Sequence, residues 1–256
     1  IPMTLKKLLE VRFKPTTDLL VVGISWVLVV ASLAAATFIA TPQRGGTYFI
    51  LYALVGAALF GVGLPVWWLV WRRGRPIAEL GLTTRLLGVS LVLQIIFAAI
   101  QYVITLGRAD FPPLSTLLPL VALALAIGFF EAVFWRGWVL LRLEDSFGVI
   151  PAVLLGAALY ALYHIGYGMP WSEIGFLFLI GVLYAVIFRL TKNIFILWPF
   201  LQPMGQLTTL LNDGLPLPPI ATVGFLEALA VMIAIVVFVP RLYRRRKGGG
   251  ATLKAA

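Results

Sequence analysis

Apolar residues fill the chain in eight long runs, each bounded by charged residues, proline or glycine. A helix of about 20 apolar residues is long enough to cross the hydrocarbon core of a bilayer. The pattern therefore predicts an all-α polytopic membrane protein, a bundle of about eight transmembrane helices. The expected spans are 18–40, 47–71, 85–106, 114–142, 149–168, 173–190, 194–212 and 219–240.

Two of these spans differ from the others. The fourth is long enough to tilt in the bilayer or to extend past it. The seventh contains Pro199 and Pro203. Because proline lacks the backbone N–H that a helix interior needs, we expect this span to be kinked, with some carbonyl groups free of helix bonding.

Composition agrees with this pattern, since 61% of the 256 residues are hydrophobic and only 12% are charged. A soluble fold of this length needs far more polar surface, so the classes of soluble protein are excluded. The chain has no cysteine. Disulfides and thiolate catalysis are therefore excluded as well.

The formal net charge of +10 is explained by topology. All but two of the 20 lysines and arginines, Arg44 and Arg108, fall in segments that the predicted spans place on one side of the membrane. Basic residues mark the cytoplasmic side, so both termini are expected in the cytoplasm. We therefore expect no nucleic-acid partner, and interpret the RLYRRRK segment (241–247) as a contact with anionic lipid.

Five polar side chains lie deep inside the predicted spans. Counted from the basic boundary at 1.5 Å per residue, Glu131 lies at about 16 Å, His164 at about 22 Å and Glu227 at about 20 Å. Gln202 and Gln206 lie at about 12 and 18 Å. The sequence therefore predicts one polar layer, contributed by four helices, near the middle of the bilayer.

A carboxylate at this depth costs about 2.5–3.5 kcal/mol, so Glu131 is expected to face the bundle interior and to have a partner. His164, the single histidine of the chain, is the natural one. A carboxylate beside an imidazole can take and pass on a proton. With water admitted from one face, Glu131 could deprotonate it for attack on a peptide carbonyl.

Structural roles for the same residues remain open. Glu131 could form an ion pair with Arg136, and His164 could form an ordinary hydrogen bond between helices. Gln202 and Gln206 could be packing groups, and Glu227 could bond a hydroxyl or a backbone group. Glu131 and His164 supply only two strong ligands where catalytic zinc takes three, so we expect no metal and no cofactor.

The residues also resemble a known family. EAVFWRG (131–137) resembles the EExxxRG motif of the CAAX prenyl protease and bacteriocin-processing (CPBP, or Abi) family of intramembrane endopeptidases, and YALYH (160–164) is similar to its (F/Y)xxxH motif. RPIAELGLTTR (75–85) resembles the LGL segment that precedes the family core. The resemblance covers roughly 75–212, and eight spans suit the architecture of the family.

This resemblance implies roles for individual residues. Glu131 would activate water with the help of His164, and Arg136 would orient the helix end. Gln202 and Gln206 occupy the places of the HxxxN pair that lines the oxyanion side, and a glutamine amide can still donate hydrogen bonds there. The chain departs from the family pattern at both glutamines and at Ala132, which stands where the second motif glutamate belongs.

The leading hypothesis is therefore a CPBP-like intramembrane endopeptidase that cleaves a membrane-embedded or lipid-proximal peptide or protein, in a prokaryotic plasma membrane. The alternative is an inactive member that acts as a scaffold, an assembly partner of other membrane proteins or a ligand-binding subunit. A transporter with a proton relay through Glu131 and Glu227 is a third hypothesis, which the lack of internal repeats disfavours. We divide the chain into an N-terminal part (1–74), a CPBP-like core (75–212) and a last span with a basic tail (213–256).

Overall fold

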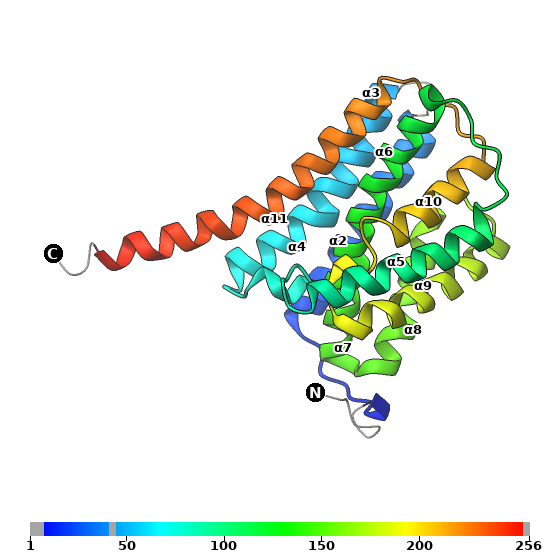
Figure 1. Ribbon diagram of the computed structural model, residues 1–256. Coiled ribbons are helices and arrows are strands. Elements are labelled where there is room, and N and C mark those ends of the chain that lie inside the picture. Colours follow the sequence, from blue (N-terminus) through cyan, green and yellow to red (C-terminus); the bar gives the residue numbers. More distant parts are fainter. Residues whose placement is uncertain (1–7, 41–44, 253–256) are drawn as a thin grey trace.

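The computed structural model describes residues 8–40 and 45–252, and every regular element in them is helical. In a bilayer a spanning segment must satisfy its backbone groups internally, which a helix does. Within these two ranges, seven helices are long and apolar enough to cross a membrane, so the chain is an all-α, multi-pass membrane protein. Figure 1 shows them as one tilted bundle from which the C-terminal part of the last helix extends.

The first two spans form an antiparallel pair. The first consists of α2 (Thr17–Ala34) and the wider π-helical turns of η1 (Ala35–Ala40). The second consists of α3 (Gly45–Phe49), η2 (Ile50–Gly63), α4 (Leu64–Val66) and η3 (Trp67–Arg72). A short 3-10 helix, η4 (Ile77–Leu80), then leads into the third span, α5 (Leu87–Thr105).

The fourth span lies at the centre of the bundle. It runs through α6 (Leu114–Glu131), the π-helix η5 (Ala132–Leu140) and α7 (Leu141–Phe147), and 78% of its apolar window is buried, against 17% for α5. The next two spans are α8 (Val149–Leu162) with η6 (Tyr163–Tyr167), and α9 (Trp171–Thr191). The α6 helix packs against α10 (Leu201–Asn212) and α11 (Ala221–Thr252), whereas α8 packs against α9.

The predicted seventh span, 194–212, is not a continuous helix. The chain forms one 3-10 turn, η7 (Ile194–Ile196), and then the 12-residue helix α10, which is too short to cross a membrane as a helix. The prolines explain this break. Pro199 disfavours helical backbone at Trp198, and Pro203 is tolerated because it lies in the first turn of α10, where its missing N–H is not needed.

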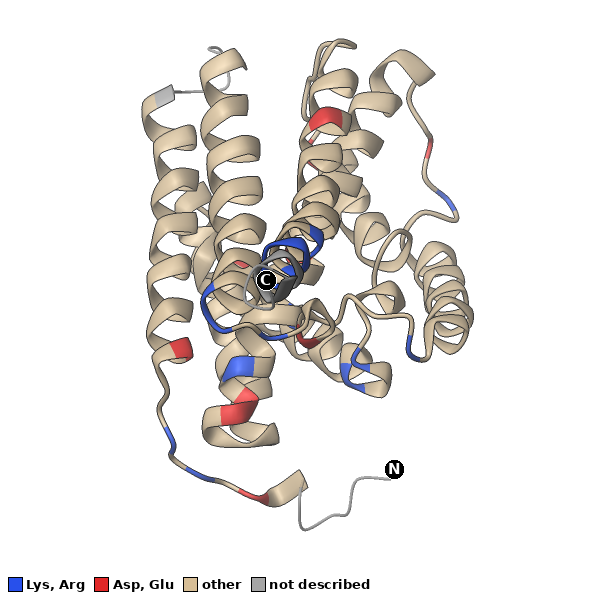
Figure 2. Cartoon of the chain, turned by 90° about the vertical axis from the view of Figure 1, so that its left-hand side faces the viewer, with Lys and Arg blue, Asp and Glu red and all other residues tan. Residues whose placement is uncertain are grey.

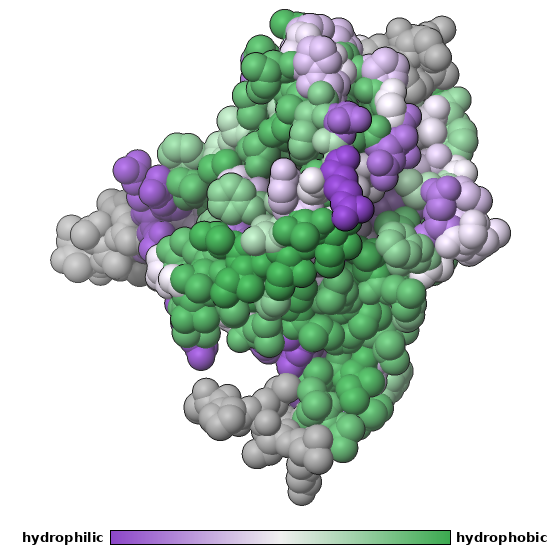
Figure 3. Space-filling model, turned by 45° about the vertical axis from the view of Figure 1, so that its right-hand side comes forward, coloured by the Kyte–Doolittle hydropathy of each residue, from purple (hydrophilic) through white to green (hydrophobic). Residues whose placement is uncertain are grey.

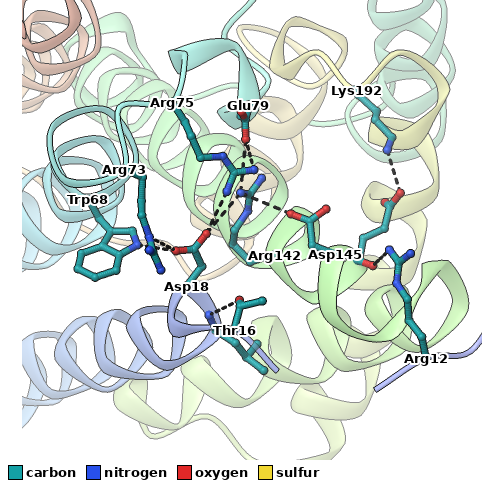
Figure 4. A network of polar contacts seen from close by, with 12 residues as sticks. Arg12, Thr16, Asp18, Trp68, Arg73, Arg75, Glu79, Arg142, Asp145 and Lys192 are labelled. Atoms are coloured by element: carbon teal, nitrogen blue, oxygen red, sulfur yellow. Dashed lines mark hydrogen bonds and ion pairs between the residues drawn. The ribbon is translucent and has the colours of Figure 1, made fainter. Parts of the chain in front are cut away.

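Charged segments from different parts of the sequence meet at one end of the bundle (Figure 2). Asp18 accepts hydrogen bonds from Trp68 Nε1 (2.8 Å), Arg73 Nε (2.9 Å) and Arg75 Nη1 (3.0 Å), as Figure 4 shows. Arg142, only 3% exposed, lies 3.9 Å from Asp18 at the centre of this network. The predicted clustering of basic segments is therefore present, although the side of the membrane that they face stays a prediction.

The same end of the bundle receives three further segments. Glu144 pairs with Arg189 and with Lys192 Nζ (2.8 Å), and its carbonyl oxygen accepts from Arg12 Nη2 (2.9 Å). Near the C-terminus, the ring of Tyr243 lies 5.9 Å from that of Trp71. The N-terminal segment around Arg12 and the part of α11 around Tyr243 thus both lie at this end of the bundle. Lys6, Lys7, Arg44 and Lys254, which the sequence assigns to one side or the other, lie outside the described residues.

Candidate functional site

Glu131 is the last residue of α6 and is completely buried, with 0% exposure. The next residue, Ala132, begins the π-helix η5. Such wider turns occur mostly as short insertions inside α-helices and frequently accompany functional sites. The glutamate thus faces the interior of the bundle, as the sequence predicts.

Three hydrogen-bond donors close around the Glu131 carboxylate. Tyr163 Oη donates to Oε1 at 2.7 Å, while Gln202 Nε2 and Gln206 Nε2 donate to Oε2 at 2.6 and 2.9 Å. Tyr160 Oη lies 3.5 Å from Oε2. A buried carboxylate is stable when donors satisfy its oxygens, so the two glutamines do meet Glu131, as a shared polar layer requires.

A close approach of two helices brings the glutamines to this place. A Cβ on Gly128 of α6 would lie 2.6 Å from Pro203 Cγ of α10, so only glycine leaves room for the proline ring. Gly128 lies one turn before Glu131, and Gln202 directly precedes Pro203. This contact therefore fixes the depth at which α10 presents its amides to the carboxylate.

His164 belongs to η6 and is 5% exposed. Its Nδ1 lies 3.0 Å from the carbonyl oxygen of Tyr160. A carbonyl oxygen only accepts, so Nδ1 carries the hydrogen and Nε2 keeps a free lone pair. Among the described residues His164 makes no hydrogen bond to Glu131; instead its ring lies 4.1 Å from that of Tyr163, whose hydroxyl holds the carboxylate.

Arg136 does not pair with Glu131, although the sequence leaves that ion pair open. The guanidinium is 0% exposed and lies over the rings of Tyr160 (4.9 Å) and Tyr184 (6.0 Å). None of its three nitrogens has a hydrogen-bond partner within the described chain. Arg136 is thus held by cation–π contacts in the middle of η5 rather than by a carboxylate.

Glu227 lies apart from the other four polar residues. It is exposed on α11 and has no hydrogen bond or ion pair with any residue that the structure describes. Equal depth along separate helices does not fix which face of each helix a residue occupies. The predicted layer therefore contains Glu131, Gln202 and Gln206, with His164 beside it, but not Glu227.

The sequence interpretation assigns no role to two residues of this site, Tyr160 and Tyr163. Both lie inside the segment YALYH, and both reach the carboxylate or the imidazole. The spacing of these tyrosines along the helix is the feature of the sequence that could identify them. Residues 160, 163 and 164 share one face of a helix, so tyrosines there line the same space as His164.

The segments of the family motifs also contact one another. A Cβ on Gly137, the glycine of EAVFWRG, would collide with the carbonyl oxygen of Leu80, the first residue of the LGL segment. Gly81 has a φ of 73°, and its carbonyl oxygen accepts from Ile194 N at 3.0 Å. The LGL segment therefore closes against η5 and η7, at the basic end of the central span.

No group of three or more histidine, cysteine, aspartate and glutamate side chains within the described ranges could hold a metal ion. That no cofactor takes part in the chemistry stays a prediction. In the site itself, the contacts to Glu131 come from tyrosine and glutamine, which donate hydrogen bonds there and leave the carboxylate as the basic group.

One comparison with known proteins gives a match. The model of the family described as Rce1-like, type II CAAX prenyl endopeptidase, matches residues 113–200, about a third of the chain. This segment runs from the start of α6 to the turn before α10 and includes Glu131, Arg136 and His164. No curated protein and no solved structure matches the chain.

Proposed function

We propose that this multi-pass membrane protein, whose residues 113–200 match the model of the Rce1-like family of CAAX proteases, is an intramembrane endopeptidase. It hydrolyses a peptide bond in a membrane-embedded or lipid-proximal peptide or protein. The observation that carries the proposal is Glu131, a fully buried carboxylate whose contacts are all neutral donors. A carboxylate inside an apolar bundle is costly and serves a purpose by default.

In the proposed reaction Glu131 takes a proton from a water molecule, and the resulting hydroxide attacks the peptide carbonyl carbon. The tetrahedral intermediate then loses the amine, which receives a proton, so one water is consumed and an acid and an amine are released. His164 supports this transfer. Its Nδ1 is fixed by the Tyr160 carbonyl, which leaves Nε2 free to exchange a proton.

The glutamine amides support the oxyanion in this scheme. Each NH2 group has two hydrogens, and Gln202 and Gln206 each donate one to Glu131. The second hydrogen of each group can be donated to a substrate oxygen. This proposal keeps Gln202 and Gln206 as polar support and leaves Arg136 a structural part of η5.

Three substitutions test the chemistry. Glu131→Gln keeps the volume but cannot accept a proton, and His164→Ala removes the imidazole, so both should reduce cleavage to background. Glu173→Gln, on the exposed start of α9, is the matched control. Purified proteins in vesicles are given a prenylated peptide and its unprenylated equivalent, and fragments are measured by mass spectrometry. If the wild-type protein cleaves the peptide and both Glu131→Gln and His164→Ala still cleave it, the mechanism is contradicted.

A second function rests on a different observation. Ala132 replaces the second motif glutamate, and both glutamines are already bonded to the one that remains. A site closed in this way suits an inactive member that serves as a membrane scaffold, assembly or ligand-binding subunit. Wild-type protein that cleaves neither peptide, while its fold stays intact, supports this second function.

Location and lipid contacts belong to the same proposal. We place the protein in a prokaryotic plasma membrane, with the basic C-terminal end of α11 at anionic lipid. Arg246 lies over the ring of Trp71 (5.6 Å) and Lys247 over that of Tyr243 (5.2 Å), and such pairs of aromatic and basic residues suit the headgroup region. A higher unfolding temperature in phosphatidylglycerol than in phosphatidylcholine vesicles, lost when both basic residues become glutamine, is the expected result.

A further inference from the structure

Glu227 is the one polar residue of the predicted layer that the proposed chemistry does not use. It follows the first residue of α11, Ala221, by about 9 Å along the helix, and precedes Arg241 at the basic end by about 21 Å. A hydrocarbon core is about 30 Å thick. The carboxylate therefore lies within the apolar part of the span rather than at its rim.

The side chain points away from the bundle. The opposite side of α11 is buried in the core through Phe225, Ala228 and Met232. On the outer side Glu227 has only apolar neighbours one turn away, Val223 (50% exposed) and Val231 (43% exposed). Nothing in the described chain neutralises or hydrogen-bonds the carboxylate. Figure 3, which views the molecule from another side, shows a broad hydrophobic area on its surface.

We propose that this face of α11 docks a transmembrane helix of another protein, one that carries a lysine or arginine at the depth of Glu227. The Glu227 face consists of Val223, Leu226, Glu227, Ala230 and Val231, all exposed. Complementary charge is the reason for this choice, because a carboxylate in hydrocarbon is stabilised when a cation pairs with it. Ala230 is small, so the backbone of a second helix can come close beside the carboxylate.

A second copy of this chain fits the Glu227 face less well. The basic residues of the described ranges lie at the charged end of the bundle, with two exceptions. Arg136 is fully buried, and Arg108 lies in the loop beyond α5. Two copies packed in parallel through this face would instead bring two carboxylates together, which repel one another.

The test uses synthetic transmembrane peptides and does not depend on peptidase activity. Each is a leucine–alanine helix of about 20 residues, with lysine or leucine at the sixth position from one end. The full-length protein carries one fluorescent label on an introduced cysteine, Asp213→Cys, because the native chain has none. Energy transfer in phosphatidylcholine vesicles then reports binding of the labelled peptide.

The lysine peptide should bind wild-type protein about tenfold more tightly than the leucine peptide, as expected for a polar contact between membrane helices. Glu227→Gln should remove this preference, and Glu173→Gln should keep it. Equal binding of both peptides to the wild type, or a preference that survives in Glu227→Gln, overturns the proposal. Energy transfer between copies of the protein that depends on Glu227 overturns it too, in favour of a homodimer.

Discussion

At the scale of single residues, the site is defined by how Glu131 is held. Its two oxygens accept from one tyrosine of η6 and two glutamines of α10. These donors are neutral, so they satisfy the carboxylate without cancelling its charge. Tyr163 also contacts the ring of His164 and thereby connects the two residues that the proposed reaction needs.

Tyr163→Phe removes one of these donors while the aromatic ring stays. A hydrogen bond to a charged group contributes about 1.5–3 kcal/mol, so kcat should fall about tenfold to a hundredfold. KM should stay unchanged, because the hydroxyl contacts the base rather than the substrate. The exposed Tyr102, changed to Phe, provides the control. Steady-state cleavage assays separate kcat from KM, and an unchanged kcat would show that Glu131 does not depend on this hydroxyl.

At the scale of elements, two glycines allow helices to meet. Gly128 admits Pro203 of α10, and Gly137 admits the backbone of Leu80. The first contact brings the amides of α10 to Glu131, and the second closes the LGL segment on the central span. The break at 197–200 has a related effect, since it lets α10 begin inside the bundle beside α6.

Gly128→Ala tests the first contact. The added methyl group would lie 2.6 Å from Pro203 Cγ, which forces α10 outward. Such overpacking costs about 1–3 kcal/mol in the free energy of unfolding, and cleavage should fall as Gln202 and Gln206 move away. Gly175→Ala on α9, where an added Cβ has no neighbour within 4 Å, should change the free energy by less than about 0.5 kcal/mol. Equal unfolding curves for the two variants would contradict this role of Gly128.

At the scale of the whole molecule, a polar network ties distant segments together at one end. Asp18 of the first span joins the loop after the second span and Arg142 of the central span, and Glu144 joins that span to the end of α9 (Figure 4). Arg142 is 3% exposed, so its buried positive charge is stabilised by these carboxylates rather than by water. The network therefore fixes how the N-terminal pair of spans sits against the central span.

Asp18→Asn removes the carboxylate that Arg73 and Arg75 bond and that Arg142 approaches. Breaking a fully buried ion pair from one side costs about 3–5 kcal/mol, because the remaining charge is left uncompensated. Arg73 and Arg75 are each more than a third exposed, so the cost here should lie below that range. We expect a correspondingly lower free energy of unfolding in detergent, measured with denaturant. The control is Asp110→Asn in the exposed loop before α6. Similar stability of both variants would mean that the network does not hold the bundle together.

Topology is tested with cysteines introduced into the native chain, which has none. Ser172 lies at the start of α9, on the opposite side of the bundle from the basic network. Ser172→Cys should therefore react with an impermeant thiol reagent added outside intact cells. Thr84→Cys, near the network, should not react. Thr84 is exposed, and it is a better position than Gly74, whose φ is 65° and whose Cβ would lie 2.7 Å from Tyr243 Oη. Labelling at Thr84→Cys would mean that the chain has the opposite orientation in the membrane.

The sequence by itself determined the class of protein, seven of its spans, the burial of Glu131 and the meeting of the glutamines with it. A long apolar run is stable in a bilayer as a helix, because a helix satisfies its own backbone hydrogen bonds. The resemblance to a family motif identifies individual residues, such as Glu131, within such a run. The tertiary structure alone decided what surrounds them: the tyrosine donors, the cation–π cradle of Arg136, the shortened α10 and the outward direction of Glu227. Depth along a helix follows from counting residues, but the direction of a side chain depends on which helices pack against it, and those contacts join residues far apart in the sequence.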